Sequence, residues 1–491
     1  MNLDEELMLA SVVTMKTRGV IPWVSFDTTT IGPISSWFLH GVSALAGMLD
    51  YQRVHVLAAA MWAAMGMICV LLVFLLTSRR GAIVSFFIVS VTFFVTLKPD
   101  YLHFNSEILP SLFLSLGVLS LTLVRGRNVG TVKSCLLVAL CGFLCSTSML
   151  GKLQAAPVAM FVFSGALLLC LAGSKKQRML SVLSLLLGFS ALPLFLTSWM
   201  VVIGESGTAW DAYFSTALSY GKTQSWNSSR ISHLGLDVWN GWGFWRPFLI
   251  MSILVLILFP STRPANLEPE RRIEWAFLFG WLLASLCAVA MPAKRWEHHG
   301  TFLVAPSVVF LSYLIAMAAR GGIPEWQRWK SRTTSIALFL VWLGFCFPHL
   351  RSLDLERLSV TTDTKHWQQA LFQKIAREAD GRPVAVWGWA PSLFAEMNLP
   401  SSTRHMISHF LIDESPAREN LRKAYMKDLR ENPPAVFLDA VCQGFFLWSW
   451  SDYPKRRAES FPELQDFLNK HYDKQITKPY PAHVYTLKKQ N

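Results

Sequence analysis

Charged residues are scarce in this chain and nearly absent from its hydrophobic segments. Only 16% of the residues are Asp, Glu, Lys or Arg, whereas 52% are hydrophobic. This balance and a mean hydropathy of +0.36 exclude an ordinary soluble protein and indicate a polytopic membrane protein. Charges inside the segments and internal repeats, both typical of transporters, are lacking, which disfavours transport.

Cysteine is also rare outside the hydrophobic segments, where Cys442 stands alone among the eight cysteines of the chain. One cysteine cannot build a disulfide framework, and no CxxC metal spacing occurs. The region after residue 352 lacks GxGxxG and GxxxxGK[ST], so we predict no nucleotide site there. The net charge of +13 lies largely in short loops, so membrane orientation explains it better than nucleic-acid binding.

Ten segments approach the roughly 20 apolar residues that a membrane span needs. They are 54–77, 81–98, 108–124, 134–150, 155–173, 179–203, 246–262, 273–292, 301–319 and 335–350. Basic residues occupy every second loop between them, namely Arg79 and Arg80; Arg125, Arg127 and Lys133; Lys175, Lys176 and Arg178; Arg263, Arg271 and Arg272; and Arg320, Arg328, Lys330 and Arg332. Because basic residues near span ends are retained in the cytoplasm, the sequence predicts that these loops are cytoplasmic and the others face outward.

This topology divides the chain into three regions. Residues 1–50 form a first outer loop with interfacial helices, including an amphipathic stretch at 5–17. Residues 51–350 form the transmembrane domain, whose outer loop 204–245 is rich in Trp and Tyr and is expected to lie on the membrane surface or over a lipid cleft. Residues 351–491 form an outer domain.

No signal peptide precedes the acidic residues at the start, although the topology places them outside. We therefore expect the natural chain to begin earlier, with a first span that is missing here. The alternative, a cytoplasmic tail with a span at 31–50, conflicts with the polar residues of that stretch and would invert the charge rule for all later loops.

The outer domain alternates between helical and extended patterns. Helices are predicted at 364–378, 415–430 and 461–471. Apolar strands are predicted at Val384 to Trp387, at Ala435 to Leu438 before Asp439, and at 483–487. This order predicts a small α/β domain with a partly parallel sheet.

Acidic candidates lie in two outward segments. Asp4 and Glu5 begin the first helix, where they either complement the helix dipole or supply a catalytic carboxylate. Glu107 begins the third span at membrane depth, where an ionisable group is a functional candidate, although a solvated loop with a helix cap is the alternative. Asp100 and His103, just before it, are candidates for acceptor or metal binding.

Basic candidates lie in two further outward segments. Lys152 occupies a tight turn, where it either binds a phosphate as a point charge or extends to lipid headgroups. Arg295, His298 and His299 precede the ninth span, where an interfacial anchor is the rival explanation. Adjacent histidines do not face one way on a helix, so this pair alone does not imply a metal site.

The order of these parts resembles the GT-C glycosyltransferases that use polyprenyl-phosphate sugars, particularly the branch of protein O-mannosyltransferases and lipid A aminoarabinose transferases. The matching elements run in order along the chain: Asp4-Glu5, Gly19 to Trp23 and on to Asp27, Gly32-Pro33-Ile34 to Trp37, Ser106-Glu107, Lys152-Leu153-Gln154, His298-His299 to Pro306, Trp387-Gly388-Trp389, and Pro434 to Asp439. Gly32 is a departure, since some relatives carry Lys before this proline, and the first span of the family is absent.

The resemblance implies an inverting transferase of a bacterial inner membrane, with its outer domain outside the cytoplasm. It would move a sugar from a polyprenyl-phosphate donor to a hydroxyl of a lipid-linked glycan, lipid A core or protein. Asp4 would be the general base, with Glu5 as its neighbour. Lys152, Arg295, His298 and His299 would bind the donor phosphate, and Glu107 would order the acceptor or a divalent cation.

Other functions stay open at this point. An oligosaccharide ligase or polymerase also combines many spans with outward cations, although its key residues are usually Arg and His rather than an acid near the first span. A non-catalytic membrane binding subunit or a transporter is the alternative outside enzymes. Fold resemblance by itself does not fix the chemistry.

Overall fold

The computed structural model describes residues 3–95, 103–126, 130–172, 175–222, 245–259, 262–292, 297–320, 366–442, 445, 453–475 and 481–488. The chain divides into two compact units. The first unit comprises Met1–Val54, Thr197–Thr223 and Val360–Asn491. The second unit comprises His55–Leu196 and Gln224–Ser359.

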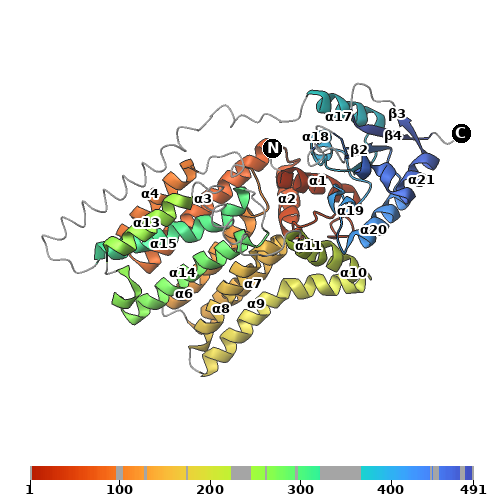
Figure 1. Ribbon diagram of the computed structural model, residues 1–491. Helices are drawn as coiled ribbons and strands as arrows, with labels where there is room; N and C mark the ends of the chain where they lie inside the picture. Colours follow the sequence, from red (N-terminus) through yellow and green to blue (C-terminus); the bar gives the residue numbers. More distant parts are fainter. Residues whose placement is uncertain are drawn as a thin grey trace. The chain divides into compact units, whose positions relative to one another are not determined.

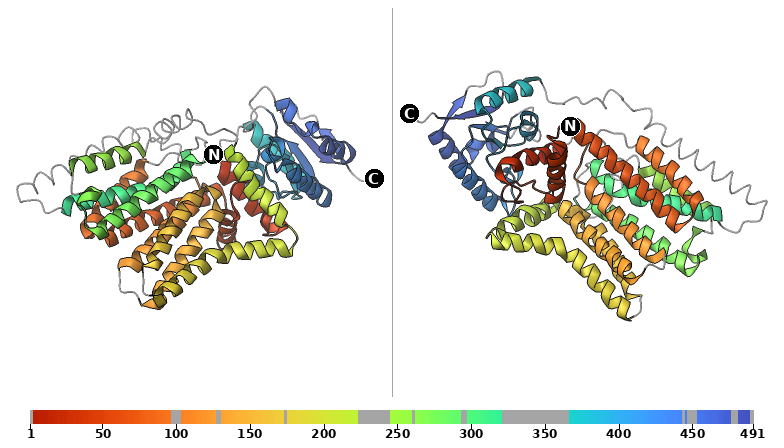
Figure 2. Two further views of the ribbon diagram at one scale, coloured as in Figure 1. Left: turned by 60° about the horizontal axis from the view of Figure 1, so that its bottom comes forward. Right: turned by 180° about the vertical axis from the view of Figure 1, so that it is seen from behind.

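The second unit is helical. Its helices are α3 (Tyr51–Leu76, which begins in the first unit), α4 (Arg79–Val95), α6 (Ile108–Gly126), α7 (Thr131–Gly151), α8 (Ala156–Leu171), α9 (Lys175–Val202, which ends in the first unit), α13 (Trp245–Leu258), α14 (Pro269–Ala290) and α15 (Thr301–Arg320). Short 3₁₀ turns are η1 (Leu153–Ala155), η4 (Pro264–Asn266) and η5 (Glu297–Gly300). Figures 1 and 2 show α7, α8 and α9 side by side.

The predicted spans are largely confirmed. Within the described ranges, seven helices are long and apolar enough to cross a membrane: Tyr51–Leu76, Ile108–Arg125, Thr131–Gly151, Leu153–Leu171, Lys175–Val202, Pro269–Ala290 and His298–Ala319. The predicted segments 81–98 and 246–262 are helices of 17 and 14 residues, α4 and α13. The predicted span 335–350 lies outside the described residues. The chain is thus a multi-pass membrane protein.

Burial distinguishes a central span from a peripheral one. In the span His298–Ala319, 83% of the 18 most apolar consecutive residues are buried. The corresponding share in Lys175–Val202 is 11%. Helix α15 packs on α4, α6, α13 and α14, which explains its burial. The exposed leucines of α9, including Leu183, Leu187 and Leu194, suit contact with lipid chains.

The first unit combines the outer α/β domain with two other segments. Its helices are α1 (Leu3–Arg18), α2 (Pro33–Ala46), α10 (Ser206–Ala209), the π-helix η2 (Trp210–Ser215), α11 (Thr216–Lys222), α17 (His366–Ala379), α18 (Ser392–Met397), α19 (His409–Ile412), α20 (Arg418–Glu431), η7 (Tyr453–Arg456), η8 (Ala458–Ser460) and α21 (Pro462–His471). Its strands are β1 (Val384–Trp387), β2 (Val436–Asp439), β3 (Tyr472–Gln475) and β4 (His483–Leu487).

The predicted partly parallel sheet is confirmed. Its strand order is β1-β2-β4-β3, with β1 and β2 parallel and the other pairs antiparallel. Every residue of β1 and β2 is buried, as expected for strands covered on both faces. Strand β3, which was not predicted, carries Asp473, Lys474 and Gln475, and this polar composition hides it from a search for apolar runs.

The helix predicted at 5–17 is present as α1, but its amphipathic reading is wrong. Every side chain from Glu5 to Met15 is buried, including Ser11 and Thr14. Both hydroxyls donate to backbone carbonyls within the helix, at 2.6 Å and 2.9 Å. This satisfies them without water while α1 packs on α2 and α18.

Candidate functional site

The candidate site of the second unit lies where three spans begin or end. Glu107 immediately precedes α6, Lys152 joins α7 to η1, and His298 and His299 belong to η5 before α15. All four side chains are buried. The structure thus brings together four of the residues that the sequence analysis selected from three separate segments.

Lys152 and Glu107 form the centre of this cluster. The Lys152 ammonium lies 3.0 Å from Glu107 Oε1, and the two side chains are 8% and 0% exposed. Lys152 Nζ also donates to Ser106 Oγ at 2.5 Å, and Ser106 Oγ donates to Glu107 Oε2 at 3.1 Å. His299 Nε2 lies 3.8 Å from Glu107 Oε1. In a buried pair of this kind, the attraction between the partners offsets the cost of removing them from water.

Local backbone contacts position these groups. The Glu107 amide donates to Asn105 Oδ1 at 3.3 Å, in the manner of an Asx turn at the start of α6. Lys152 has an extended backbone between two helices, and its amide donates to Ser148 O at 3.0 Å. Gln154 Nε2 donates to Ala288 O at 2.9 Å, which ties η1 to α14. Extension to lipid headgroups, the alternative for Lys152, and an interfacial anchor, the alternative for His298 and His299, therefore do not describe these buried side chains.

Glu107, His298 and His299 also fit a divalent cation. One ligand atom from each lies within 4.8 Å of the others, and a carboxylate with two imidazoles is a ligand set that Zn²⁺ and similar ions accept. The expectation that adjacent histidines would diverge was based on α-helical geometry. The two residues instead occupy the 3₁₀ turn η5, and their rings meet edge to face at 5.0 Å between centroids. The Lys152 ammonium beside Glu107 works against a cation, since like charges repel.

His103 has a different environment. Its Nδ1 lies 2.8 Å from His55 Nε2, with the rings edge to face. The sequence analysis selected His103 but missed His55, because the two residues lie 48 positions apart and α3 carries no motif there. Asp100 and Arg295, the other candidates of these loops, lie outside the described residues, as do residues 223–244 of the outer loop.

Asp4 and Glu5 belong to the first unit, in the first turn of α1. Asp4 is half-buried and Glu5 is fully buried. The next residue, Glu6, was not selected from the sequence. Burial, reinforced by the nearby carboxyls of Glu396 and Glu5, raises the pKa of Glu6 to about 8. Glu6 therefore holds its proton at neutral pH, which distinguishes it from an accessible base.

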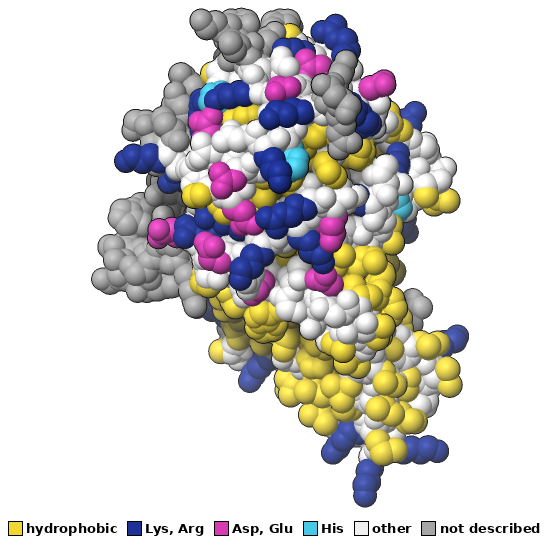
Figure 3. Space-filling view, turned by 90° about the vertical axis from the view of Figure 1, so that its right-hand side faces the viewer, with side chains coloured by type: hydrophobic (Ala, Val, Ile, Leu, Met, Phe, Trp, Pro, Cys, Tyr) yellow, Lys and Arg dark blue, Asp and Glu magenta, His cyan; other side chains and the backbone are white. Residues whose placement is uncertain are grey.

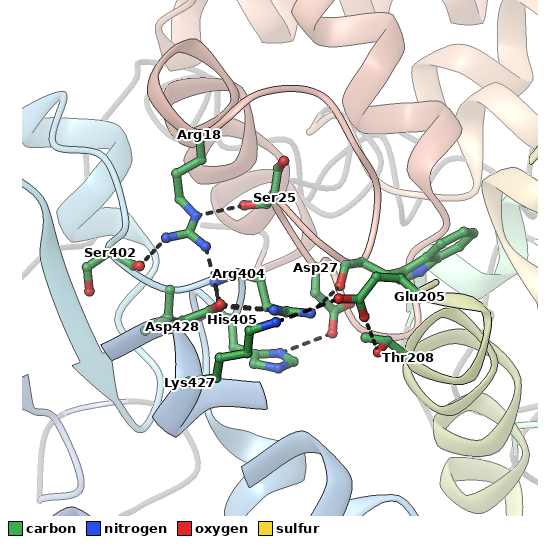
Figure 4. A network of polar contacts seen from close by, with 12 residues as sticks. Arg18, Ser25, Asp27, Glu205, Thr208, Ser402, Arg404, His405, Lys427 and Asp428 are labelled. Atoms are coloured by element: carbon green, nitrogen blue, oxygen red, sulfur yellow. Dashed lines mark hydrogen bonds and ion pairs between the residues drawn. The ribbon is translucent and has the colours of Figure 1, made fainter. Parts of the chain in front are cut away.

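A second polar network of the first unit, also missed, joins residues far apart in the sequence (Figure 4). Arg404 donates to both Asp428 oxygens, at 3.0 Å and 2.9 Å. Arg18 Nη2 lies 3.4 Å from Asp428 Oδ1, and Arg18 also donates to the Ser402 carbonyl. His405 Nδ1 lies 3.0 Å from Asp27 Oδ2. These contacts connect the first 30 residues to the outer domain, so we assign the network a structural role.

The comparisons with known proteins concern the whole chain. No protein-family model and no curated protein matches it. Two solved structures of ArnT from Cupriavidus metallidurans are similar over 99% of this chain and 93% of that chain, at 10% sequence identity. The TM-score is 0.57 for ArnT in the apo state and 0.59 for ArnT bound to undecaprenyl phosphate. The chain therefore has a GT-C fold.

A third structure, the oligosaccharyltransferase AglB from Archaeoglobus fulgidus in complex with an inhibitory peptide and a dolichol-phosphate, has a TM-score of 0.48. It is 11% identical and covers 99% of this chain and 70% of that chain. The similarity to ArnT confirms, at the level of the fold, the resemblance to GT-C glycosyltransferases stated from the sequence.

Proposed function

We propose that this protein is a membrane glycosyltransferase that moves a sugar from a polyprenyl-phosphate donor to a hydroxyl group of a lipid-linked glycan, a lipid A core or a protein. The observation that carries this proposal is the buried cluster of Lys152, Glu107, His298 and His299 at the ends of spans. The GT-C fold, and the undecaprenyl phosphate bound to one ArnT structure, support the same class of donor.

The cluster supplies what a phosphate leaving group needs. A Lys ammonium acts as a point charge, and its effect on a phosphate is larger in a site that excludes water. Lys152 is buried, so little solvent screens it. In the proposal, Lys152 and Arg295 bind the donor phosphate, and His298 and His299 donate to its oxygens. A divalent cation held by Glu107, His298 and His299 would add positive charge beside the phosphate when bound.

The proposed reaction is a single displacement. The acceptor oxygen forms a bond to the anomeric carbon of the sugar while the bond from that carbon to the phosphate oxygen breaks. The polyprenyl phosphate leaves with the electron pair, the configuration inverts, and the acceptor proton passes to a carboxylate. We assign that carboxylate to Asp4, because Glu6 holds its own proton at neutral pH and Glu5 is fully buried.

The proposal also specifies the membrane face on which the reaction takes place. The donor would be used on the outer face of a bacterial inner membrane, and the outer domain would shape the acceptor site. The regular alternation of basic loops supports this placement.

Transfer of radiolabelled sugar from crude polyprenyl-phosphate donors, in membranes that contain the protein, tests the function. Wild type should transfer label, and Asp4→Asn should reduce transfer by roughly 100-fold or more, the range that general-base catalysis supplies. Glu6→Gln is the matched control two residues away. It should retain transfer, because the native side chain is already protonated.

The outcomes test the class of reaction and the roles of single residues independently. Transfer that survives in Asp4→Asn would keep the transferase and move the base to Glu5 or Glu107. A whole glycan found on the acceptor would favour the ligase or polymerase. If wild type transfers nothing from any polyprenyl-phosphate fraction while folded protein is present, the transferase proposal is wrong.

A further inference from the structure

A cavity of about 170 Å³ lies among the ends of α6 and α8 and the beginnings of α7 and α9. Its polar side chains are Thr131, Ser134, Gln177 and Ser181. Val138 and Cys170, 1% and 5% exposed, form its apolar interior. The volume exceeds the roughly 30 Å³ occupied by one water molecule several times over, so a chemical group as large as a phosphoglycerol head can enter.

The packing of α7 on α9 explains why the cavity exists. A Cβ atom built on Gly188 would lie 2.0 Å from Ala139 O, and one on Gly142 would lie 2.4 Å from Leu185 O. The two helices are thus in backbone contact at this level. The cavity lies one to two helical turns closer to the N-terminal ends of α7 and α9, where it separates Ser134 of α7 from Ser181 of α9. These small side chains leave it open.

The chain segments that line this cavity carry basic residues and no acidic ones. The sequence from Val124 to Ser134 and from Cys170 to Ser181 contains no Asp or Glu. It contains Arg125, Arg127, Lys133, Lys175, Lys176 and Arg178. Arg125 lies 3.8 Å from Glu274 Oε1 of α14, whereas the side chains of Lys133, Lys175, Lys176 and Arg178 are exposed. Figure 3 shows Lys and Arg side chains without acidic ones at the lower tip of the hydrophobic surface. Two helices begin and two end here, so their dipoles largely offset each other and the side chains set the potential.

We propose that this cavity binds the headgroup of an anionic phospholipid. The hydroxyls and the Gln177 amide offer donors to a phosphate, and the flanking lysines supply charge. Leu180, an exposed apolar side chain next to the lining residue Ser181 on α9, offers a contact for an acyl chain. Membrane orientation alone would account for the lysines, but it requires no cavity with polar walls beside them.

This site is distinct from the candidate active site and does not rest on the proposed function. Thr131 is the first residue of α7, and Lys152 directly follows the last of its 21 residues. At 1.5 Å per residue, about 30 Å separates the two sites along the helix.

Lipid binding by the purified full-length protein tests the proposal. The probes are dioleoyl phosphatidylglycerol, dioleoyl phosphatidylcholine with the same acyl chains, and inorganic phosphate. Native mass spectrometry measures the bound fraction after removal of detergent, and the midpoint of thermal unfolding gives an independent readout. We expect phosphatidylglycerol to bind at least about tenfold more tightly than phosphatidylcholine. Inorganic phosphate, a free anion without acyl chains, should not compete at millimolar concentration.

The variants locate the binding. Lys175→Gln/Lys176→Gln should weaken phosphatidylglycerol binding about tenfold, because two charges are removed beside the cavity. Arg79→Gln/Arg80→Gln is the matched control, since it removes two exposed basic residues at the start of α4. It should leave binding unchanged. Ser181→Phe should block binding by filling the cavity with an apolar ring.

Three results would overturn the proposal. These are equal binding of both lipids, equal losses in the two double variants, and full phosphatidylglycerol binding by Ser181→Phe. The double lysine variant changes only exposed side chains, so a failure of Ser181→Phe to fold would leave the test intact. A fourth result, competition by inorganic phosphate, would also overturn it, because the cavity would then bind a free anion and not a lipid.

Discussion

At the scale of single residues, Lys152 and Glu107 show both the reach and the limit of the sequence. Both were selected because an ionisable side chain at the end of a span is costly unless it has a partner or a function. Their pairing at 3.0 Å was not predicted, since the sequence separates them by a whole helical hairpin. The convergence of His298 and His299 was missed because the geometry of a 3₁₀ turn cannot be read from two adjacent letters.

The buried pair predicts a double-mutant result. Lys152→Met removes one charge and leaves Glu107 buried without its cation, which should lower the free energy of unfolding by about 3 kcal/mol or more. Lys152→Met/Glu107→Gln removes both charges and should recover a large part of that loss. Chemical unfolding of the detergent-purified variants measures this. Additive losses in the double variant would mean that the two side chains do not interact.

Glu6 predicts a dependence on pH. Its pKa rises on folding from 4.5 to about 8 through burial, so the native carboxyl keeps a proton that the unfolded one releases. Stability therefore falls as the pH rises through this window. Glu6→Gln should match wild type below pH 4.5 and become the more stable protein by pH 9, by an amount on the order of 5 kcal/mol. Parallel stability curves for the two proteins across the window would contradict this.

We expect the loss of the buried ion pairs of Asp428 to lower the free energy of unfolding more than the loss of an exposed ion pair. Asp428→Asn leaves Arg404 and Arg18 with reduced charge compensation in the core of the first unit and should cost about 3 kcal/mol. Glu463→Gln is the control, because Glu463 and its partner Arg430 are 46% and 56% exposed. That change should cost less than about 1 kcal/mol. Similar losses of unfolding free energy in both variants would show that Asp428 is not a centre of the network.

At the scale of elements, the sequence predicted where helices and strands occur better than it predicted which of their faces are buried. The apolar spans and the strands β1, β2 and β4 follow from hydrophobic patterns that local sequence carries. Helix α1 was placed correctly but its burial was not, because its covering helices α2 and α18 come from distant parts of the chain. Burial depends on these long-range contacts, and no local pattern encodes them.

The contact between α7 and α9 gives a prediction at this scale. Gly188→Ala places a methyl group against the backbone of Ala139, so the helices must separate, at a cost of about 1–3 kcal/mol. Gly41→Ala is the matched control in α2, where a Cβ meets nothing within 4 Å. It should be neutral or slightly stabilising, since Ala favours helices over Gly. The midpoints of thermal unfolding compare the two, and equal midpoints would argue against the close approach.

At the scale of the whole molecule, three segments that the sequence analysis treated separately form one unit. Residues from the first 54, from 197–223 and from 360 onward share it. The contact of Asn420 Nδ2 with Asp211 Oδ2 at 2.7 Å and the tilted rings of Trp23 and Tyr213 are examples of what joins them. Apart from residues 197–203, the end of a predicted span, these segments were predicted to face outward. Membrane topology is therefore consistent with their assembly even though it does not specify the partners.

The same topology yields the last prediction. Basic residues near span ends stay in the cytoplasm, so loops such as the one before α9 should be inaccessible from outside an intact cell. In a background without other reactive cysteines, Lys176→Cys should react with a membrane-impermeant maleimide only after the membrane is opened. Lys470→Cys, at an exposed position of α21, should react in cells whose outer barrier alone is permeable. Labelling of both positions under the same condition would place the outer domain and the basic loops on one side. If both positions react from outside, the donor sugar would have to be used on the face opposite to the one proposed, because Lys152 and the loop that contains Lys176 lie at the two ends of α8.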